Sequence, residues 1–329
     1  MPAAATPPAS MSVSLLVIAY RMADTIADAL HSALAQTWPC EIIVSDDSSG
    51  DATLSNAGAV LRDYRGSHRV RLRSTVRNLG LCAHLNELAA AAQGELLVFL
   101  SGDDIAYPER VARLVAALAA NPRAQLAGSA VDDIDADSKL IAANVRSLPP
   151  RVDQRWFLRR GRMATVLGAS MAIRRELLTA FPPLIGTVED NMLSLRAALA
   201  GDCLCLPQAL LGYRRHECNL GDWVFDRSDG RAGFERRHRR VIAMYRDIAA
   251  DQERCVAARP DLSGERRGLA LELAAMYRLE ADMREAILDR PRRQWVPLLL
   301  RGLRHPGLRR KSAERALKLL LPRRWFGRG

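Results

Sequence analysis

The sequence predicts an α/β fold in which a doubly wound sheet is followed by a C-terminal helical appendage. Apolar runs with the length of strands alternate with segments of helical period through the first 130 residues, an order typical of parallel βαβ units. One of these runs, Leu96–Leu100, ends at two adjacent acids, Asp103 and Asp104. From Arg231 onward, the apolar residues recur mainly at helical spacing.

The individual elements follow from branching and periodicity. Residues 12–19 have the β-branched content of a strand. Ile26, Leu30 and Leu34 then mark one face of a helix over residues 23–36. The same alternation predicts strands at 41–45, 70–74, 95–100 and 124–131, and helices at 52–64 and 81–92.

The end of the strand at 95–100 is the first candidate site. Ligands of open α/β sheets gather just beyond the carboxyl ends of the strands, which is where Asp103 and Asp104 stand. Helix capping is the alternative, because Pro108 suits a first helical turn and Asp is a good N-cap. One acid would satisfy such a cap, so the second indicates a cation or a polar substrate.

The first strand lacks both common phosphate-binding loops. Ala19-Tyr20-Arg21 stands where a Gly-x-Gly-x-x-Gly or a Gly-Lys-Ser/Thr sequence would be expected. We therefore expect a divalent cation, held by Asp103 and Asp104, to replace a glycine-rich loop in binding phosphates.

Composition describes an ordinary globular protein of 329 residues with 49% hydrophobic content. The six cysteines form no regular disulfide framework, which favours reduced thiols in the cytosol. No uncharged apolar run reaches the roughly 18 residues of a membrane span. The leader at 1–11 lacks a basic segment, so we expect a flexible tail rather than a signal peptide.

The net charge of +11 is unevenly distributed. Residues 290–329 carry 13 Lys and Arg against one acid, Glu314, which gives +12 and leaves about −1 for the rest. The leucine-rich stretches 295–304 and 316–326 combine these cations with aromatic residues. That combination is typical of helices lying on an anionic membrane surface.

Several ordered motifs over residues 12–220 resemble the inverting nucleotide-sugar glycosyltransferases of family 2, which have the GT-A fold. Two of them depart from the family pattern: Ala19 and Arg21 alter its Pro-x-Tyr-Asn turn, and Ser101 replaces the first acid of its Asp-x-Asp metal motif. The matching segments are Val17–Arg21, Ile43–Asp51, Asn78–Gly80 and Ser101–Asp104.

The resemblance implies roles in binding the nucleotide sugar. Asp47 would accept the imide N–H of uracil or thymine, and the Tyr20 ring or nearby backbone such as Ala19 would lie against the base. Asp46 would either share that contact or form the turn and cap the next helix. Asn78 belongs to the Asn-x-Gly turn of the same site.

The resemblance also implies a site for Mn²⁺ or Mg²⁺, which would neutralise the leaving diphosphate as a Lewis acid. Asp104 would be the ligand, and Asp103 would face the ribose or share the metal through water. The Tyr-Arg-x-His stretch starting at Tyr213 would add His216 to the metal and Arg214 to the diphosphate. Histidine suits Mn²⁺ better than Mg²⁺.

A second acidic pair, Glu189-Asp190, opens a predicted helix. Interaction with the helix dipole would explain either acid alone. In the family this motif supplies the general base, which an inverting transfer needs on the sugar face opposite the diphosphate. We assign the base to Asp190 and an orienting contact to Glu189. The resemblance also implies that 167–175 forms a strand of small residues behind the donor sugar.

These inferences divide the chain into a flexible tail at 1–11, a GT-A catalytic domain at 12–222, a helical extension at 223–289 and a basic amphipathic tail at 290–329. The expected protein transfers one sugar to a cell-surface glycan or lipid-linked acceptor. It would be cytoplasmic and held peripherally on the inner face of the membrane by its tail. The helical extension would pack on the core or on a second subunit, which would make the protein a homodimer.

Two alternatives remain open at this point. A nucleotidyltransferase would also use acids and a cation on an α/β sheet, but the chain lacks its early glycine-rich basic loop. A nucleic-acid-binding protein would explain the basic tail but neither acidic site, so we expect no nucleic-acid partner.

Overall fold

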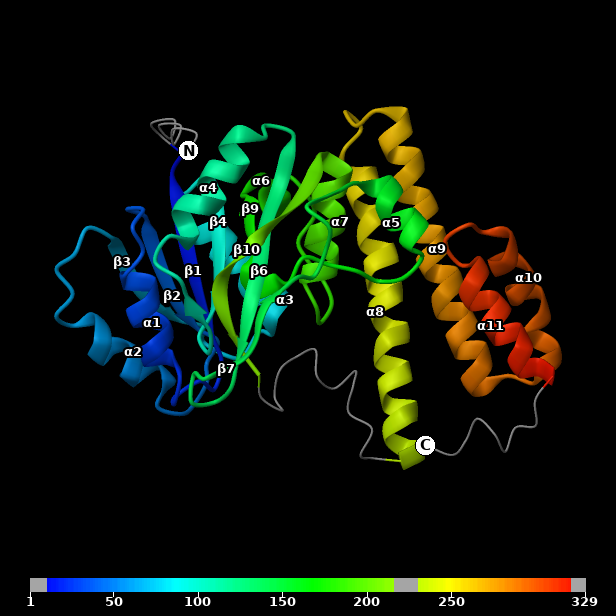
Figure 1. Ribbon diagram of the computed structural model, residues 1–329, viewed down its shortest axis with the longest axis horizontal. Coiled ribbons are helices and arrows are strands. Elements are labelled where there is room, and N and C mark those ends of the chain that lie inside the picture. The colour runs from blue at the N-terminus through cyan, green and yellow to red at the C-terminus, as the bar shows by residue number, and fades with distance from the viewer. Residues whose placement is uncertain (1–10, 216–229, 321–329) are drawn as a thin grey trace. The chain divides into compact units, whose positions relative to one another are not determined.

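The computed structural model describes residues 11–215 and 230–320, and these residues form two compact units (Figure 1). The α/β unit covers the described residues up to Val152 and from Thr165 to Arg215. The helical unit contains 153–164 and the described residues beyond 215. This division differs from the predicted one, because 153–164 joins the helical unit and the predicted extension and tail fall in the same unit.

A mixed ten-stranded sheet forms the centre of the α/β unit, in the order β3-β2-β1-β4-β9-β6-β10-β5, with β7 beside β6 and β8 beside β10. The mixed α/β class agrees with the sequence prediction. The strands are β1 (Val13–Ala19), β2 (Glu41–Asp46), β3 (Arg69–Ser74), β4 (Leu96–Ser101), β5 (Ile105–Ala106), β6 (Ala124–Ile134), β7 (Leu140–Val145), β8 (Arg151–Val152), β9 (Ala172–Arg174) and β10 (Asp202–Arg214).

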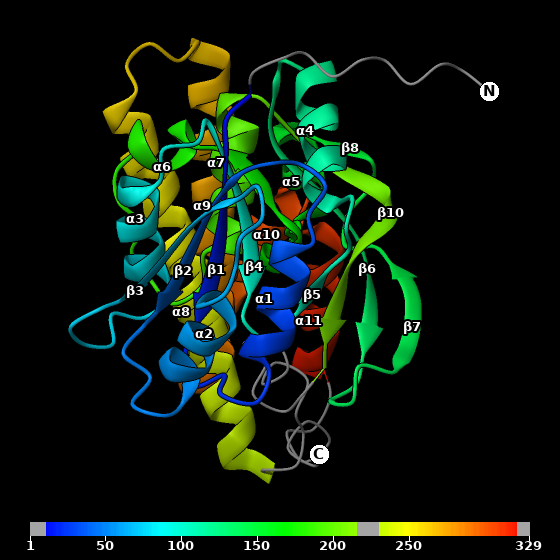
Figure 2. The same cartoon turned by 90° about the vertical axis from the view of Figure 1, so that its left-hand side faces the viewer.

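The first four strands are parallel and alternate with α1 (Ile26–Leu34), α2 (Thr53–Leu61) and α3 (Leu81–Ala91). The chain moves outward from β1 to β3 and then returns to β4 on the other side of β1. Right-handed crossovers consequently put α1 and α2 on one face and α3 on the other; Figure 2 shows α1 and α2 in front of these strands. The reversal creates a switch point between β1 and β4, where open sheets bind ligands.

The core of this sheet is apolar on both faces, as expected for strands covered by helices. Leu15, Leu16 and Val17 of β1 are fully buried, and the interior of β4 is equally inaccessible. Such continuous burial explains why these strands were readable as unbroken apolar runs.

The second half of the unit differs in detail from the prediction. The predicted strand at 167–175 is a 3-10 turn, η1 (Gly168–Ser170), followed by the short strand β9, which is antiparallel to β4 and β6. β6 continues through Asp132 and Asp133, beyond residue 131, where the predicted strand ends. The remaining helices of the unit are α4 (Arg110–Ala120), α6 (Glu176–Thr179) and α7 (Asp190–Ala200).

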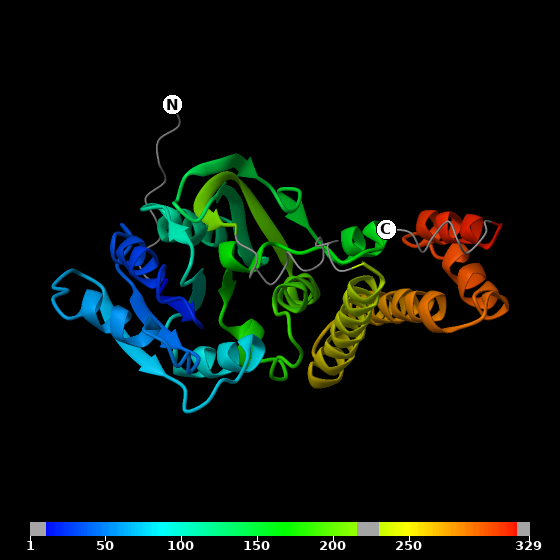
Figure 3. The same ribbon diagram turned by 90° about the horizontal axis from the view of Figure 1, so that it is seen from below.

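The helical unit contains α5 (Gln154–Arg160), α8 (Gly230–Ala258), α9 (Gly264–Asp289), η3 (Arg292–Gln294), α10 (Val296–Arg304) and α11 (Arg309–Leu320). The long helices α8 and α9 pack side by side (Figure 3). Glu280 of α9 is fully buried, and Arg315 of α11 donates to both its carboxylate oxygens at 2.7 Å. These hydrogen bonds, together with nearby cations, hold the pKa of Glu280 at about 2 against the opposing effect of burial.

Part of the predicted membrane-surface tail packs inside the helical unit. Trp295 is buried and donates its indole N–H to the Arg290 carbonyl at 3.0 Å, and Leu299 is buried beside it. An indole whose polar group is satisfied by the chain is a core residue here rather than an interfacial anchor. Val296, Leu300 and Leu317 remain exposed.

Within 11–215 and 230–320, none of the helices combines the length and apolar character needed to cross a membrane.

Candidate active site

The acids after β4 lie at the switch point because the sheet brings its carboxyl ends together. The register pairs Ala19 of β1 with Asp46 of β2, and Ile18 of β1 with Ser101 of β4. Gly102 leaves room for the side chains of Met22 and Ile26, since a Cβ would lie 2.9 Å from the Met22 sulfur and 3.0 Å from Ile26 Cδ1.

The two acids after Gly102 have different environments. Asp104 is fully buried. Its Oδ1 accepts the Arg214 backbone N–H at 2.9 Å, whereas its Oδ2 has no hydrogen-bond partner among residues 11–215 and 230–320. Burial, reinforced by the charge of Asp103, raises the pKa of Asp104 well above its usual range. Asp103 is only partly buried. Asp103 is therefore the more accessible of the two carboxylates, and the assignment of the metal to Asp104 stays a prediction.

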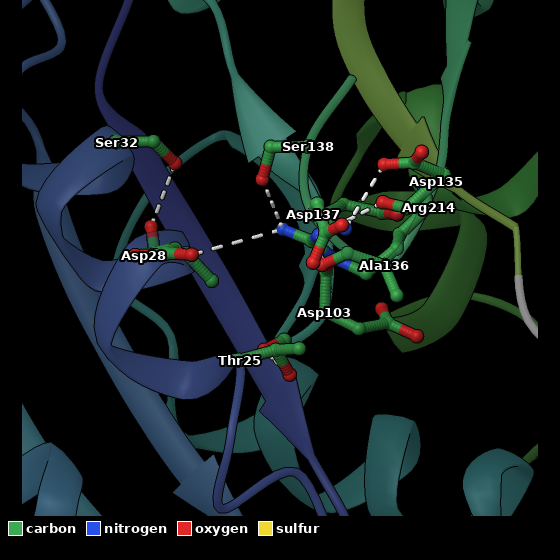
Figure 4. A network of polar contacts seen from close by, with 12 residues as sticks. Thr25, Asp28, Ser32, Asp103, Asp135, Ala136, Asp137, Ser138 and Arg214 are labelled. Atoms are coloured by element: carbon green, nitrogen blue, oxygen red, sulfur yellow. Dashed lines mark hydrogen bonds and ion pairs between the residues drawn. The ribbon is translucent and has the colours of Figure 1, made fainter. Parts of the chain in front are cut away.

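Arg214 is committed to the protein itself (Figure 4). Its guanidinium donates to the Asp103 carbonyl at 2.8 Å, the Asp135 carbonyl at 3.0 Å and the Ser138 hydroxyl at 3.0 Å, and the residue is 2% exposed. Arg214 thus connects the end of β4 to the turn after β6. The diphosphate contact predicted for it stays a prediction.

The carboxylates after β2 are satisfied by nearby chain. Asp46 accepts the Ser49 N–H at 3.0 Å, which is the turn geometry given as its alternative role. Asp47 accepts from the Thr75 hydroxyl at 3.0 Å and from the backbone N–H groups of Leu79 and Gly80 at 2.9 Å each. These contacts anchor the turn that opens α3.

The other residues predicted to contact the nucleotide lie at the same edge. The Asn78 amide donates to the Asp47 carbonyl at 3.2 Å, so Asn78 also supports the turn. Tyr20 is 40% exposed beyond the end of β1, whereas Ala19 is buried. Tyr20 and Asn78 are therefore the exposed members of this group.

The second acidic pair opens α7, where Glu189 is the N-cap residue and Asp190 the first helical residue. Burial and the charge of Asp190 raise the pKa of Glu189. Burial also raises the pKa of Asp190, although hydrogen bonds from Asn191 and Thr165 oppose the shift. A carboxylate with an elevated pKa is better matched to accepting a proton near neutral pH.

The turn η1 lies against this pair. A Cβ on Gly168 would stand 2.5 Å from a Glu189 carboxylate oxygen and 3.4 Å from Asp190 Cβ. A glycine is therefore needed for the turn and the acids to approach this closely.

Sequence reasoning missed Thr165 and Arg110. Thr165 hydrogen-bonds to Ser194 of α7 at 3.0 Å and supports Asp190; an isolated threonine in a loop gives no signal of this. Arg110 is fully buried. The sequence did offer a signal, because Arg110 stands with Val111 and Leu114 on the apolar stripe of a helix. An arginine on such a stripe is expected to be buried, and a fully buried arginine almost always has a partner.

The residues present meet the chemical needs of Mg²⁺ or Mn²⁺ in part. Carboxylate oxygens are suitable for such cations, and the buried Asp104 Oδ2 lacks a protein donor. However, the described parts of the chain contain no cluster of three or more His, Cys, Asp or Glu side chains able to hold a metal. The predicted third ligand, His216, lies outside the described residues.

The fold with acids at its switch point is that of GT-A glycosyltransferases. The solved structure of S. aureus TarS 1–349 in complex with UDP-GlcNAc superposes with a TM-score of 0.55 at 18% identity, covering 88% of this chain and 80% of that one. The Pyrobaculum calidifontis mannosyltransferase PcManGT, in complex with GDP-Man and Mn²⁺, gives 0.53 at 19% identity over 94% and 85%. At these identities the likeness shows the fold alone.

The chain belongs to glycosyl transferase family 2, whose family model matches residues 14–181, just over half of its length. The succinoglycan biosynthesis protein ExoO of Rhizobium meliloti (strain 1021) is 38% identical over 126 residues, which is 37% of this chain and 33% of the relative. An uncharacterized protein of Mycobacterium tuberculosis (strain H37Rv) is 29% identical over 230 residues, 68% and 64% of the two chains. Family and fold agree with the resemblance read from the sequence.

Proposed function

We propose that the chain is a metal-dependent inverting glycosyltransferase that moves one sugar from a nucleotide-diphosphate donor to a hydroxyl of a glycan or lipid-linked acceptor. Family membership supports glycosyl transfer. Metal dependence, inversion and the acceptor are our inferences from the residues.

The observation that carries the proposal is the presence of two separate acidic sites on different elements of the α/β unit. Asp103 and Asp104 follow β4 at the switch point, whereas Glu189 and Asp190 open α7 with elevated pKa values. An inverting displacement needs these two functions, one at the leaving diphosphate and one at the attacking hydroxyl.

In the proposed reaction, the Asp190 carboxylate accepts the proton of the acceptor hydroxyl as its oxygen bonds to the anomeric carbon. The bond from that carbon to the diphosphate oxygen breaks, and its electron pair leaves with the nucleotide. Glu189 orients the acceptor. Because the pKa of Asp190 is raised by burial, its carboxylate is a stronger base than a solvated aspartate.

Asp103, with Asp104 behind it, would hold the divalent cation, and His216 is kept as a further candidate ligand. The cation, when bound, would neutralise negative charge on the diphosphate. Tyr20 would stack on the base and Asp47 would meet its edge, with Asp46, Asn78 and Ala19 shaping that end of the site. Arg214 would act near the diphosphate, chiefly by fixing the Asp103 backbone.

We also propose a cytoplasmic location on the inner face of the membrane. ExoO is named for succinoglycan biosynthesis, and a lipid-linked acceptor would give a basic tail a purpose. Exposed Leu300 and Leu317 and the +12 charge of 290–329 support contact with anionic lipid. Sedimentation with anionic but not neutral liposomes is expected, weakened by Leu300→Asp; equal binding to both would refute an electrostatic anchor.

The activity is tested by incubating the protein with a panel of nucleotide sugars and Mn²⁺ or Mg²⁺. One donor should be consumed with release of nucleoside diphosphate, and NMR of the product should show an inverted anomeric centre. Asp190→Asn should abolish consumption, while Asp247→Asn, in the helical unit, should not. Transfer with retention, or undiminished turnover by Asp190→Asn, would overturn the mechanism.

A further inference from the structure

Arg110, the first residue of α4, is a fully buried arginine between structural elements that carry the two acidic sites. Removing a guanidinium from water costs several kcal/mol unless the protein supplies compensating contacts. The groups that the buried guanidinium contacts are therefore important for understanding its role.

The contacts of Arg110 join β4 to η1. Its Nη2 donates to the Phe99 carbonyl at 2.7 Å and to the Ala169 carbonyl at 2.7 Å. Phe99 lies in β4, the strand that ends at the first acidic site, and Ala169 is the middle residue of η1. The neighbouring Gly168 lies directly against Glu189. One side chain therefore links the elements beside each pair of acids.

A second, direct contact joins the same two elements. The Phe99 N–H donates to the Met171 carbonyl at 3.0 Å. Arg110 thus completes a bridge in which both polar backbone groups of Phe99 are used, one directly and one through the guanidinium.

The guanidinium of Arg110 is only partly satisfied by hydrogen bonds. Its Nε and Nη1 have no hydrogen-bond partner in the described part of the chain, and the charge of Asp104 acts to keep Arg110 protonated. Burial lowers the pKa of Arg110 to about 10, so the side chain remains charged at neutral pH. With no exposed surface, it has no access to a substrate and can act only through the groups it holds.

We propose that Arg110 is a positioning residue that fixes the spacing between the two acidic sites by holding η1 against the end of β4. The proposal depends on the function proposed above only in assigning chemistry to those sites; the mechanical link is independent of it.

The link is tested by hydrogen exchange of the full-length protein without substrate. The Ser170 and Met171 amides donate to the Leu167 and Gly168 carbonyls within η1, so a loosened turn exposes them. Arg110→Met should speed their exchange at least about tenfold, and Arg110→Lys, which keeps a charged donor, should speed it less.

Arg174→Met is the matched control. Arg174 also bridges two carbonyls, those of Ala124 at 3.0 Å and Leu118 at 3.2 Å, but it pairs with Leu96 at the opposite end of β4. It should destabilise the protein without speeding exchange at Ser170 and Met171. Unchanged exchange in Arg110→Met, or equal acceleration in the control, would overturn the link.

Kinetics tests the consequence. A misplacement of about 1 Å can cost 100-fold in rate, so Arg110→Met should lower kcat about 100-fold while KM for the sugar donor stays within about threefold. Arg110→Lys should recover about tenfold of that loss. If Arg110→Met does not fold, Arg110→Lys alone decides: a kcat equal to wild type, or a parallel loss in Arg174→Met, contradicts the proposal.

The two proposals fail differently. A wild-type protein that transfers no sugar with any donor refutes the function, whereas the exchange of η1 in the variants still tests Arg110. Normal transfer with unchanged exchange refutes only the role of Arg110.

Discussion

Two groups of acids in the α/β unit are wholly or partly buried, yet the groups that surround them differ. Asp46 and Asp47 accept hydrogen bonds from the loops around them. Among the described residues, Asp104 keeps one oxygen without a hydrogen-bond partner, and burial raises the pKa values of Asp104, Glu189 and Asp190, for Asp190 despite hydrogen bonds from Asn191 and Thr165. Carboxylates held by hydrogen bonds stabilise a loop, whereas a carboxylate whose charged form is disfavoured by burial can be stabilised by a proton or a cation.

The largest expected effect is the loss of activity in Asp190→Asn, which should leave stability unharmed. Loss of a general base should lower kcat about 1,000-fold, and thermal stability should be retained or increased because a disfavoured charge is removed. Turnover with the best donor and a thermal melt measure the two effects. A large drop in melting temperature with proportionate loss of activity would instead make Asp190 structural.

Substitution of Asp47, whose carboxylate accepts hydrogen bonds from the chain, should instead destabilise the protein. Asp47→Ala leaves the N–H groups of Leu79 and Gly80 without their acceptor, so the free energy of unfolding should fall by about 3 kcal/mol. Urea denaturation measures this. Asp63→Ala, an exposed aspartate in the same unit, is the control and should change stability by less than about 0.5 kcal/mol.

A finer comparison lies within the pair after β4. Asp103→Asn should weaken Mn²⁺ binding at least about tenfold, because the accessible carboxylate is lost; Asp104→Asn should weaken it less and alter stability more. Titration calorimetry with Mn²⁺ alone, in the absence of donor, measures both. The opposite ranking would restore Asp104 as the principal ligand.

The smallest expected effect is a pH dependence at the Glu189–Asp190 pair. The base must be deprotonated, and its pKa is raised, so activity should fall on acidification at a higher pH than the value of about 3.9 for a free aspartate. The stability of the protein should change with pH in the opposite direction to its activity. Acids whose pKa is raised in the folded state favour folding at low pH, and that contribution disappears as pH rises through the folded pKa. Asp190→Asn should flatten that stability dependence.

The parallel half of the fold could be predicted because β1, β2 and β4 are unbroken apolar runs between helices of regular period. The ends of elements were harder to predict. β6 runs through Asp132 because its carboxylate accepts from the Tyr107 hydroxyl and the Asn144 N–H at 2.7 Å each, and both partners are distant in sequence. The neighbouring acids Asp132 and Asp133 give no indication of these contacts when the sequence is read alone.

The sequence identified acids as candidate site residues, but it could not show how deeply each one is buried or which groups it contacts. Which of Asp103 and Asp104 is buried depends on how the Arg214 backbone and α4 pack around them, and adjacent positions in a sequence do not show this. Trp295 illustrates the same limit, since its indole is satisfied by the Arg290 carbonyl rather than at a lipid interface.

The assignment of α5 to the helical unit affects how this protein can be divided. The chain passes between the units after Val152, after Ala164 and after Arg215, and Phe157 of α5 is fully buried where α5 packs on α9. A truncation at Arg215 would therefore strip α5 of its partner and expose a phenylalanine to aggregation. The α/β unit is therefore best expressed together with the C-terminal helices.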